Sequence, residues 1–392
     1  MHLLPRVHRI LTVGSHTHTY AMPALPPVHG SYFLLHDPKP HVSWTNSPPR
    51  TYLAPRAMIF KFRLFFVVAS AALLGITWCI HIRIQAAAHA TPRGSTYRGF
   101  NSTAHLPSTN YAIVTFLTGQ ASDESYFTAT RVLTHQLLHA ESTKVNQNNT
   151  SFLVLCSETV PAEQKATLRG DGATVVEIRD VPVNWWIRSA ETRWKEQFSK
   201  LRVFEMEEYS RILYLDADTV LTGPVDGIFA EPEVVSLTST LDRKDQVRWG
   251  EAKLPSEWLF AARSDAALTG ERTHPTPPLQ SKSFNAGFFL IKPDRQVFAH
   301  ILSVMALVGR FDTHTMEQGL LNYVFRREGR MPWRELHWRW SATWPTERDL
   351  EEGVVTLHDR LWKTGPQPLR DLWNAKKGEM MNYHEKRKMA AA

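Results

Sequence analysis

Cysteine is scarce in this chain of 392 residues, where it occurs only as Cys79 and Cys156. Cys79 lies inside a long apolar run, and Cys156 lies in a short run that predicts a strand. The part of the chain beyond the apolar run therefore has one thiol and no partner for an internal disulfide. The spacing of a zinc site and the pattern around a cysteine nucleophile are both missing. We expect a domain stabilised by its hydrophobic core, which a chain of this length can build.

The chain also lacks a glycine-rich phosphate loop and a recognisable nucleic-acid-binding module. Gly119-Gln120-Ala121-Ser122 is a poor substitute for the glycine-rich, basic loop of an enzyme that makes sugar nucleotides. The formal net charge is +7, but much of the excess lies near the two ends of the chain. We therefore do not interpret the positive charge as a nucleic-acid surface.

The first part of the chain predicts a tail, a membrane segment and a stem. Residues 1–57 are rich in Pro, His and Arg without periodicity, which is typical of a disordered tail. Leu64–Ile82 is an almost unbroken apolar run, so residues 58–83 are interpreted as a transmembrane signal anchor. Basic residues lie mainly before this run, which places the tail in the cytosol and the rest in the lumen. Residues 84–109 have the composition of a flexible stem.

A cleaved signal peptide is the alternative for the apolar run, and it fits better if translation begins at Met58. The long stretch upstream and an imperfect cleavage site favour the uncleaved anchor. Glycosylation sequons at Asn101, Asn148 and Asn149 fit a lumenal domain. We expect a single-pass type II membrane protein whose folded domain covers residues 110–375 and is followed by a basic tail, 376–392.

Within residues 110–375, apolar runs with strand character alternate with helical periodicity. The expected strands are Tyr111–Leu117, Phe152–Cys156, Ala173–Ile178, Ile212–Leu215, Val234–Thr238, Ala286–Ile291 and Val354–Leu357. The expected helices are Tyr126–Leu138, Pro161–Leu168, Trp194–Glu208, Arg295–Val308 and Met316–Arg327. Asp242–Ser283 is a polar stretch with no assigned element. Such alternation predicts an α/β fold with a mainly parallel sheet covered on both faces, which binds ligands beyond the carboxyl ends of its strands.

Asp216-Ala217-Asp218 directly follows the strand expected at Ile212–Leu215. In an extended chain, residues two apart point to one face, so both carboxylates can hold one hard divalent cation. Two negative charges at an apolar strand end are costly unless a cation or hydrogen-bond donors compensate them. Such a triplet also occurs where an acidic residue only caps a turn, so its context matters. The expected partner of the cation is a diphosphate.

Other segments surround this triplet in a specific order. The stretches are Tyr111-Ala112-Ile113-Val114-Thr115, Ser199-Lys200-Leu201, Tyr214-Leu215-Asp216-Ala217-Asp218-Thr219, Phe284-Asn285-Ala286-Gly287 and Glu317-Gln318-Gly319-Leu320-Leu321-Asn322. From Tyr111 to about Lys363 the chain thus resembles the glycogenin-like glycosyltransferases, glycosyltransferase family 8. The anchor and stem are similar to those of fungal Golgi members of the family, including N-acetylglucosaminyltransferases. The resemblance therefore implies a Golgi membrane protein.

The resemblance implies the GT-A fold, a UDP-sugar donor and Mn²⁺ or Mg²⁺. It also implies transfer of a hexose or N-acetylglucosamine, with retention, to a glycan, glycolipid or glycoprotein acceptor. Asp216 and Asp218 then hold the metal, with His358 as the third ligand. Ala217 belongs to the donor site with them. The family's His-Phe-Leu-Gly run is replaced here by His358-Asp359-Arg360-Leu361-Trp362-Lys363, so Lys363 is expected to bind the diphosphate, with Arg360 as a competitor.

The remaining site residues come from the same resemblance. Glu317 and Gln318, which open a helix, are expected at the reacting centre, although the family has Asp where this chain has Glu317. Lys200 is expected to contact the donor phosphate or sugar and to serve catalysis, against the alternative of a solvated helix face. The other expected donor contacts are Asn285 to the sugar and Phe116, Thr118 and Tyr126 to the uracil and ribose.

Two other functions share parts of this pattern. A nucleotidyltransferase that makes sugar nucleotides would have a similar sheet, but it needs the glycine-rich loop that is missing here. A non-catalytic lumenal protein that binds sugars or sugar nucleotides on a transferase fold is the second alternative. The intact pair Asp216 and Asp218 disfavours it, whereas the altered segment after His358 leaves it open.

Overall fold

The computed structural model describes residues 110–119, 124–188, 196–265 and 274–391, all of which belong to the unit Leu73–Ala392. The tail predicted at 1–57, the anchor at 58–83 and the stem at 84–109 lie outside the described residues. Among those that are described, no helix is both long enough and apolar enough to cross a bilayer.

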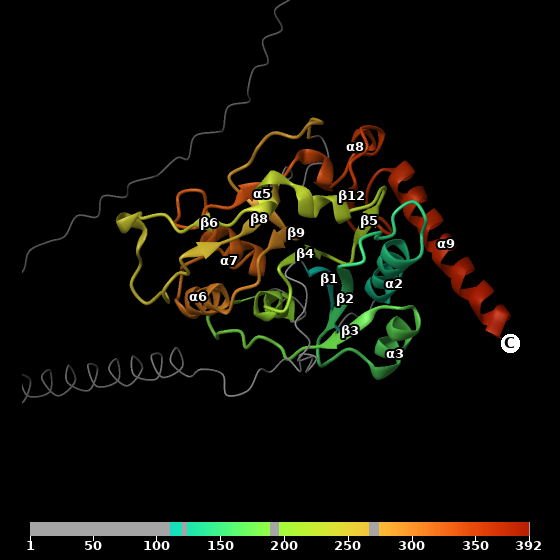
Figure 1. Ribbon diagram of the computed structural model, residues 1–392, viewed down its shortest axis with the longest axis horizontal. Coiled ribbons are helices and arrows are strands. Elements are labelled where there is room, and N and C mark those ends of the chain that lie inside the picture. Colours follow the sequence, from blue (N-terminus) through green and yellow to red (C-terminus); the bar gives the residue numbers. More distant parts are fainter. Residues whose placement is uncertain (1–109, 120–123, 189–195, 266–273, 392) are drawn as a thin grey trace, which may run out of the picture. The chain divides into compact units, whose positions relative to one another are not determined.

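Within the described residues, the central sheet has seven strands in the order β10-β8-β9-β4-β1-β2-β3 (Figure 1). Their bounds are β1 Tyr111–Leu117, β2 Thr150–Cys156, β3 Thr174–Glu177, β4 Arg211–Leu215, β8 Phe260–Ser264, β9 Phe284–Ile291 and β10 Arg334–Glu335. The pairs β1–β2, β1–β4, β2–β3 and β8–β10 are parallel, and β9 runs antiparallel between β4 and β8. The predicted mainly parallel α/β sheet is confirmed.

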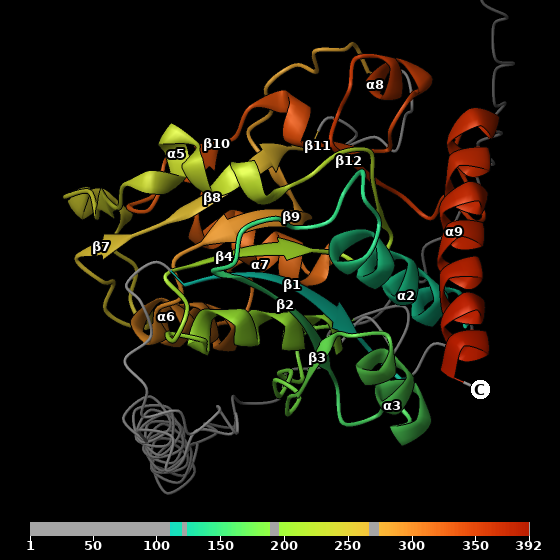
Figure 2. The same ribbon diagram turned by 45° about the vertical axis from the view of Figure 1, so that its right-hand side comes forward.

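Helices cover both faces of this sheet, as the alternation of side chains along β1 requires. Val114 and Phe116 face one core, which packs against the 3₁₀ helix η1 and the helices α6 and α7. Ile113 and Leu117 face the other core, which packs against α2, α3, η2 and α5. Figure 2 shows α6 and α5 on opposite sides of the sheet. Their bounds are η1 Gln197–Glu205, α6 Arg295–Ala306, α7 Met316–Val324, α2 Ser125–Leu138, α3 Ala162–Gly170, η2 Asp226–Ala230 and α5 Pro232–Val235.

A smaller sheet, β11-β12-β5, lies beyond the carboxyl end of β4. It is followed by the long C-terminal helix α9, which packs beside α2 (Figure 1). Leu357 and Trp373 belong to the small apolar core between the sheet and α9. The bounds are β5 Thr219–Leu221, η4 Trp338–Trp340, β11 Ser341–Thr343, α8 Glu347–Glu351, β12 Thr356–His358 and α9 Gln367–Ala391.

The domain boundary expected after residue 375 falls inside α9. Met380 is buried on this helix, and the Tyr383 hydroxyl lies 3.1 Å from Nδ1 of His139, the residue after α2. The Lys- and Arg-rich segment 376–391 is therefore helical and its first half is packed on the domain.

Two segments differ from the expected elements. The strand predicted at Val234–Thr238 is wrong: α5 occupies Pro232–Val235, and only Thr238–Ser239 is extended, as β6, which pairs with β7 (Glu257–Trp258). A proline is well suited to open a helix, and this outweighs the strand preference of the valines. The polar stretch Asp242–Ser283 contains the short 3₁₀ helix η3 (Lys244–Gln246) and the buried strand β8.

The helix expected at Trp194–Glu208 is 3₁₀ rather than α over Gln197–Glu205, and its first residues lie outside the described part. Phe198, Leu201 and Phe204 of this helix are buried against the sheet. Lys200 lies among them and is also buried, which brings a cation to the sheet face close to the end of β4.

Candidate active site

The carboxyl ends of β4 and β8 lie at one edge of the sheet, because both strands run antiparallel to β9. Asp216 follows β4 and Asp265 follows β8 at this edge. The backbone N–H of Asp216 donates to the carbonyl oxygen of Gly287 at 2.8 Å, which joins the end of β4 to the start of β9. This is the edge at which the sheet was expected to bind its ligand.

The two oxygens of the Asp216 carboxylate have different surroundings. Oδ1 accepts a hydrogen bond from the Tyr214 hydroxyl at 2.8 Å and one from Nζ of Lys200 at 3.0 Å. Oδ2 lies 3.7 Å from Nε2 of His358. The same Nε2 is 3.1 Å from Oδ1 of Asp218. One oxygen of Asp216 is thus held by the protein, and the other faces Asp218 and His358.

Asp216, Asp218 and His358 fit a divalent cation. One ligand atom from each lies within 4.8 Å of the others. Two neighbouring ligands of an octahedral ion are about 3 Å apart, because each is about 2.1 Å from the ion, and this agrees with the two separations from Nε2. Two carboxylate oxygens and an imidazole nitrogen suit Mn²⁺ or Mg²⁺, and the imidazole favours Mn²⁺.

Charge is concentrated around these three side chains. Burial alone would lower the pKa of His358, but the carboxylates of Asp218 and then Asp216 outweigh it and raise the pKa to about 9. Burial alone would raise the pKa of Asp218, but His358 outweighs it and lowers the pKa. A protonated imidazole thus offsets part of the carboxylate charge when no cation is bound. A bound cation would take the place of that proton, since only neutral imidazole is a ligand.

Gly287 gives these side chains their room. A Cβ atom at this position would lie 2.2 Å from Cε1 of His358 and 2.7 Å from Oδ2 of Asp216. Side-chain atoms do not approach this closely, so the packing of His358 and Asp216 against β9 requires glycine at this position. The close packing of these side chains therefore explains why the segment Phe284-Asn285-Ala286-Gly287 has glycine at its last position.

Lys200 lies beneath the site rather than at its surface. Its side chain is 1% exposed, and Nζ is 2.9 Å from Oε1 of Glu317 as well as 3.0 Å from Oδ1 of Asp216. Burial alone would lower the pKa of Lys200, but Asp216 and Glu317 outweigh it and raise the pKa. The ammonium stays charged and joins η1, β4 and α7. The expected alternative of a solvated helix face is wrong for Lys200, and its donor contact stays a prediction.

The start of α7 is fastened to β9 through Gln318. Its Oε1 accepts from the N–H of Ala286 at 3.1 Å, and its Nε2 donates to Oδ2 of Asp265 at 3.1 Å. Asn285 is the second residue of β9, and its Oδ1 accepts a hydrogen bond from the N–H of Gly287 at 2.8 Å. The structure therefore brings Glu317, Gln318 and Asn285 to the same edge as Asp216.

Asp265 is a residue of this edge that the sequence analysis missed. It is 6% exposed and follows β8 as Asp216 follows β4. A short apolar run, Trp258–Ala262, precedes it in the sequence. Arg263 and Ser264 separate this run from Asp265, so the signal is weaker than at Asp216, which follows its apolar run directly.

The three residues expected to contact the uracil and ribose lie in two parts of the structure, at the end of β1 and at the start of α2. Thr118 follows β1 at the site edge and is half-buried, whereas the ring of Phe116 is 6% exposed and packs in the sheet core. A nucleotide contact at Phe116 would therefore use the backbone. Tyr126 opens α2, and its ring meets Trp362 edge-on at 5.2 Å between centroids. Exposed Lys363 is the next residue in that loop, and Ala217 is 5% exposed between the two aspartates.

Residues 119–357 match the model of glycosyl transferase family 8, which is more than half of the chain. The chain belongs to this family and is a glycosyltransferase with the GT-A α/β fold. His358 and Lys363 lie just past the matched residues, so their assignment depends on the geometry described above.

The relatives include two fission-yeast proteins and several plant enzymes. An uncharacterized protein of Schizosaccharomyces pombe, C5H10.12c, is 30% identical over 70% of this chain and 81% of its own length. Galactinol synthase 7 of Arabidopsis thaliana is 27% identical over 54% of this chain and 65% of its own length. Among solved structures, apo GlyE of Streptococcus pneumoniae has a TM-score of 0.44 at 15% identity, over 71% of this chain and 64% of that one.

We predict that Gly287→Ala abolishes cation binding while the domain stays folded. The added methyl group would displace His358 or Asp216, for the steric reason given above. Calorimetric titration with Mn²⁺ should show saturable binding to the parent chain and none to the variant. Gly223→Ala is the matched control, since a Cβ there meets nothing within 4 Å. Parent-like Mn²⁺ affinity in Gly287→Ala would contradict the assigned ligands.

We predict that Lys200→Met lowers the free energy of unfolding by about 3 kcal/mol, because removing one partner leaves buried carboxylates without their cation. Chemical denaturation monitored by tryptophan fluorescence measures this change. Lys292→Met is the control: its side chain is 36% exposed and 3.6 Å from Asp294, so the expected change is below about 0.5 kcal/mol. If both variants lowered the free energy of unfolding equally, the ion pairs of Lys200 would contribute no more to stability than an exposed ion pair does.

Proposed function

We propose that this glycosyltransferase moves a sugar from a UDP-sugar to a glycan, glycolipid or glycoprotein in a reaction that depends on a divalent cation. The observation that carries the proposal is the cluster of Asp216, Asp218 and His358 at the carboxyl edge of the sheet in a family 8 chain. The expected outcome at the sugar is retention of configuration, as the family resemblance implies. The donor is proposed to carry a hexose or N-acetylglucosamine.

Asp216, Asp218 and His358 would hold the cation, Mn²⁺ or Mg²⁺. When bound, such a cation neutralises charge on the departing diphosphate and so stabilises the transition state. Tyr214 and Lys200 fix the orientation of Asp216 through Oδ1, so that Oδ2 remains directed at the ligand cluster. Binding therefore needs little rearrangement of this carboxylate.

The opening of α7 is proposed to position the sugar and the acceptor. Glu317 is 7% exposed and its carboxylate is paired with Lys200, so it contributes a fixed negative charge near the reacting carbon. Gln318 is held by Asp265 and the β9 backbone, which leaves its amide little freedom to move. Preoriented groups of this kind lower the entropic cost of reaching the reactive geometry. Asn285 would contact the donor sugar from the start of β9.

The diphosphate would also need a cation from the protein. Lys363 is exposed at the end of the loop after β12, and its N–H donates to the carbonyl oxygen of Arg360 at 2.8 Å. Lys363 therefore closes a turn that begins at Arg360, two residues after His358, and its exposed side chain is our proposed contact to the leaving group. Thr118 and Tyr126 are proposed for the nucleoside side of the same donor.

We also propose that the domain acts in the Golgi lumen, held by the apolar run Leu64–Ile82. The support is the length of the run, the basic residues before it and the sequons that follow. Asn149, one of the sequon residues, directly precedes β2.

Release of UDP from a UDP-sugar by the full chain tests the proposed reaction. We expect turnover of at least one of UDP-glucose, UDP-galactose and UDP-N-acetylglucosamine, its loss in EDTA, and its recovery with Mn²⁺. Asp218→Asn should lower the rate about a hundredfold or more, because the cation supplies several kcal/mol of transition-state stabilisation. Asp371→Asn on exposed α9 is the matched control. UDP release that persists in EDTA and in Asp218→Asn would refute the proposal.

Protease protection of microsomes tests the proposed topology. We expect a tag placed before residue 58 to be digested in sealed microsomes, while a tag after Ala392 survives until detergent is added. The expectation follows from the excess of basic residues before the apolar run. Digestion of the C-terminal tag without detergent would place the catalytic domain on the other side of the membrane.

A further inference from the structure

A cavity of about 670 Å³ lies away from the site described above. Its wall includes Ser256, which precedes β7 and β8, and Gln296, in the first turn of α6 directly after β9. Phe260 of β8 and Ile212 of β4 both pair with Ile291 of β9. These wall residues therefore lie at the edge where β4 and β8 begin, whereas Asp216 follows the end of β4.

The loop of residues 240–256 forms much of the wall and folds over α6. The N–H of Ala252 donates to Oγ of Ser303 at 2.8 Å, and Nε2 of Gln296 donates to the carbonyl oxygen of Leu254 at 3.0 Å. On the other arm, the N–H of Leu241 donates to the carbonyl oxygen of Arg330 at 3.0 Å. Hydrogen bonds thus hold the backbone of the loop in place at both of its ends, and the cavity lies between them.

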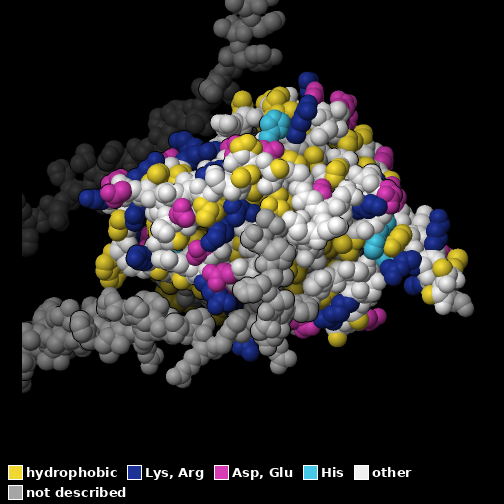
Figure 3. Space-filling model, viewed as in Figure 1, with side chains coloured by type: hydrophobic (Ala, Val, Ile, Leu, Met, Phe, Trp, Pro, Cys, Tyr) yellow, Lys and Arg dark blue, Asp and Glu magenta, His cyan; other side chains and the backbone are white. Residues whose placement is uncertain are grey.

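The lining is strongly basic. Arg248, Lys253 and Arg330 line the cavity together with one acid, Glu251. That acid is engaged from outside the lining, since Oε1 accepts from the Tyr323 hydroxyl at 2.6 Å and lies 3.5 Å from Nε of Arg310. Figure 3 shows Lys and Arg side chains at the end of the domain that carries β6, with Asp and Glu side chains among them. The excess positive charge favours an anionic ligand.

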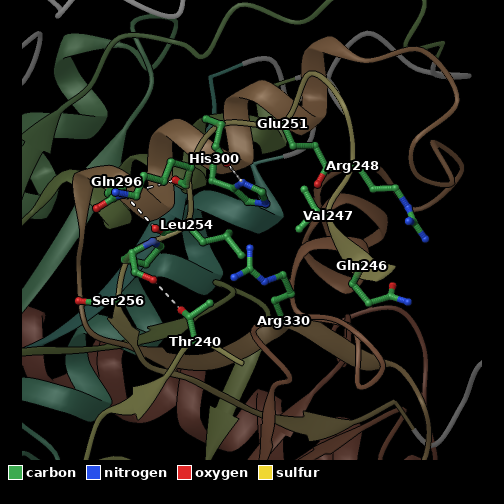
Figure 4. A pocket seen from close by; sticks show the side chains of 13 residues that line it. Thr240, Gln246, Val247, Arg248, Glu251, Leu254, Ser256, Gln296, His300 and Arg330 are labelled. Carbon is green, nitrogen blue, oxygen red and sulfur yellow. Dashed lines mark hydrogen bonds between the residues drawn. The ribbon is translucent and has the colours of Figure 1, made fainter. Parts of the chain in front are cut away.

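Arg330 is fixed in the cavity by its own backbone neighbours. Its Nε donates to the carbonyl oxygen of Leu241 at 3.0 Å. Figure 4 shows the rest of its guanidinium pointing into the cavity toward the imidazole of His300. A guanidinium held in this way presents a preorganised fork of donors, which matches carboxylate, phosphate or sulfate oxygens.

His300 adds an acceptor beside that fork. Nδ1 of His300 donates to the carbonyl oxygen of Ala252 at 2.7 Å, and burial lowers the pKa of the ring, which is neutral at pH 7. Nε2 is then the acceptor nitrogen. An acceptor next to a guanidinium suits a ligand that carries hydroxyl groups as well as an anionic group.

We propose that this cavity binds one sugar residue that carries a negative charge, as a carboxylate, phosphate or sulfate, outside the transfer site. The anionic group pairs with Arg330, and Arg248 and Lys253 supply further positive charge at the exposed rim. The volume is that of a small-molecule site and is far larger than a single phosphate ion needs. A glycosyltransferase with such a site holds a charged part of a glycan at the opposite edge of the sheet from its reacting end.

Calorimetric titration of the full chain with glucose 6-phosphate and with glucuronic acid tests this proposal. Glucose serves as the neutral probe and inorganic phosphate as the sugar-free probe. We expect at least one charged sugar to bind at least tenfold more tightly than either glucose or phosphate. It alone can contact both the Arg330 guanidinium, through its anionic group, and the acceptor nitrogen of His300, through a hydroxyl group. If glucose bound as tightly as the charged sugars, the negative charge would contribute nothing to binding. If inorganic phosphate bound as tightly, the sugar ring would contribute nothing and the cavity would be a simple anion site. Either result overturns the proposal.

Variants locate the binding. Arg330→Gln should weaken binding of the charged sugar at least tenfold, and the double variant Arg248→Gln with Lys253→Gln, on exposed side chains, should weaken it severalfold without disturbing the fold. Lys386→Gln, on an exposed turn of α9, is the matched charge control and should bind like the parent. Asp218→Asn should also bind like the parent. Loss of binding in Asp218→Asn, or full binding in both cavity variants, would place the probe elsewhere.

The cavity and the transfer reaction can fail separately. Arg330→Gln should keep the cation-dependent release of UDP, because Arg330 lies at the edge away from Asp216. Binding of a charged sugar by a chain that releases no UDP would refute the proposed reaction and leave the cavity assignment intact. Absence of saturable binding by every probe would refute the cavity assignment alone.

Discussion

The buried ammonium of Lys200 is the interaction on which the geometry of the site depends. It bridges Asp216 and Glu317, which lie 101 positions apart in the numbering, and so joins β4 to the first turn of α7 through η1. With Asp218, these residues make three carboxylates that face one ammonium. A divalent cation with neutral His358 restores electroneutrality, whereas a monovalent one does not. This excess of negative charge would favour binding of a dication over a monovalent cation at the proposed metal site.

The direction of the strands places acidic side chains at one edge of the sheet and basic side chains at the opposite edge. Because β4 and β8 run the same way, the aspartates that follow them, Asp216 and Asp265, meet at one edge. Antiparallel β9 brings Gly287 and Asn285 to that edge at its start and leads to α6 at the other. The basic wall of Arg330 and its neighbours lies there. The proposed phosphate-containing donor and the proposed acidic sugar would thus bind at opposite ends of one sheet, where they would not compete for the same cations.

Local pattern predicts the parts of this fold that are continuous in sequence. The strands β1, β2 and β4 are mainly apolar runs, and Asp216 and Asp218 indicate a shared cation once the surrounding segments are taken with them. Lys200 is different, because the sequence shows a basic residue on a helix but not which side faces the sheet. Asp265 is harder to predict because β8 contains Arg263 and lies within a polar stretch, so its apolar run does not lead directly into the aspartate. His358 was reached by family resemblance, since 140 positions separate it from Asp218 and only tertiary pairing joins them.

The position of His358 follows from the register of the small sheet. β12 pairs antiparallel with β5, and His358 stands opposite Thr219, the residue after Asp218. A slip of one residue would turn His358 away from the aspartates and expose Leu357. Leu357 is fully buried with Val220 and Trp373, so hydrophobic burial opposes that slip. The core that α9 completes therefore holds His358, the proposed third ligand, in place, which explains how this residue can keep its position although the loop after it departs from the family pattern.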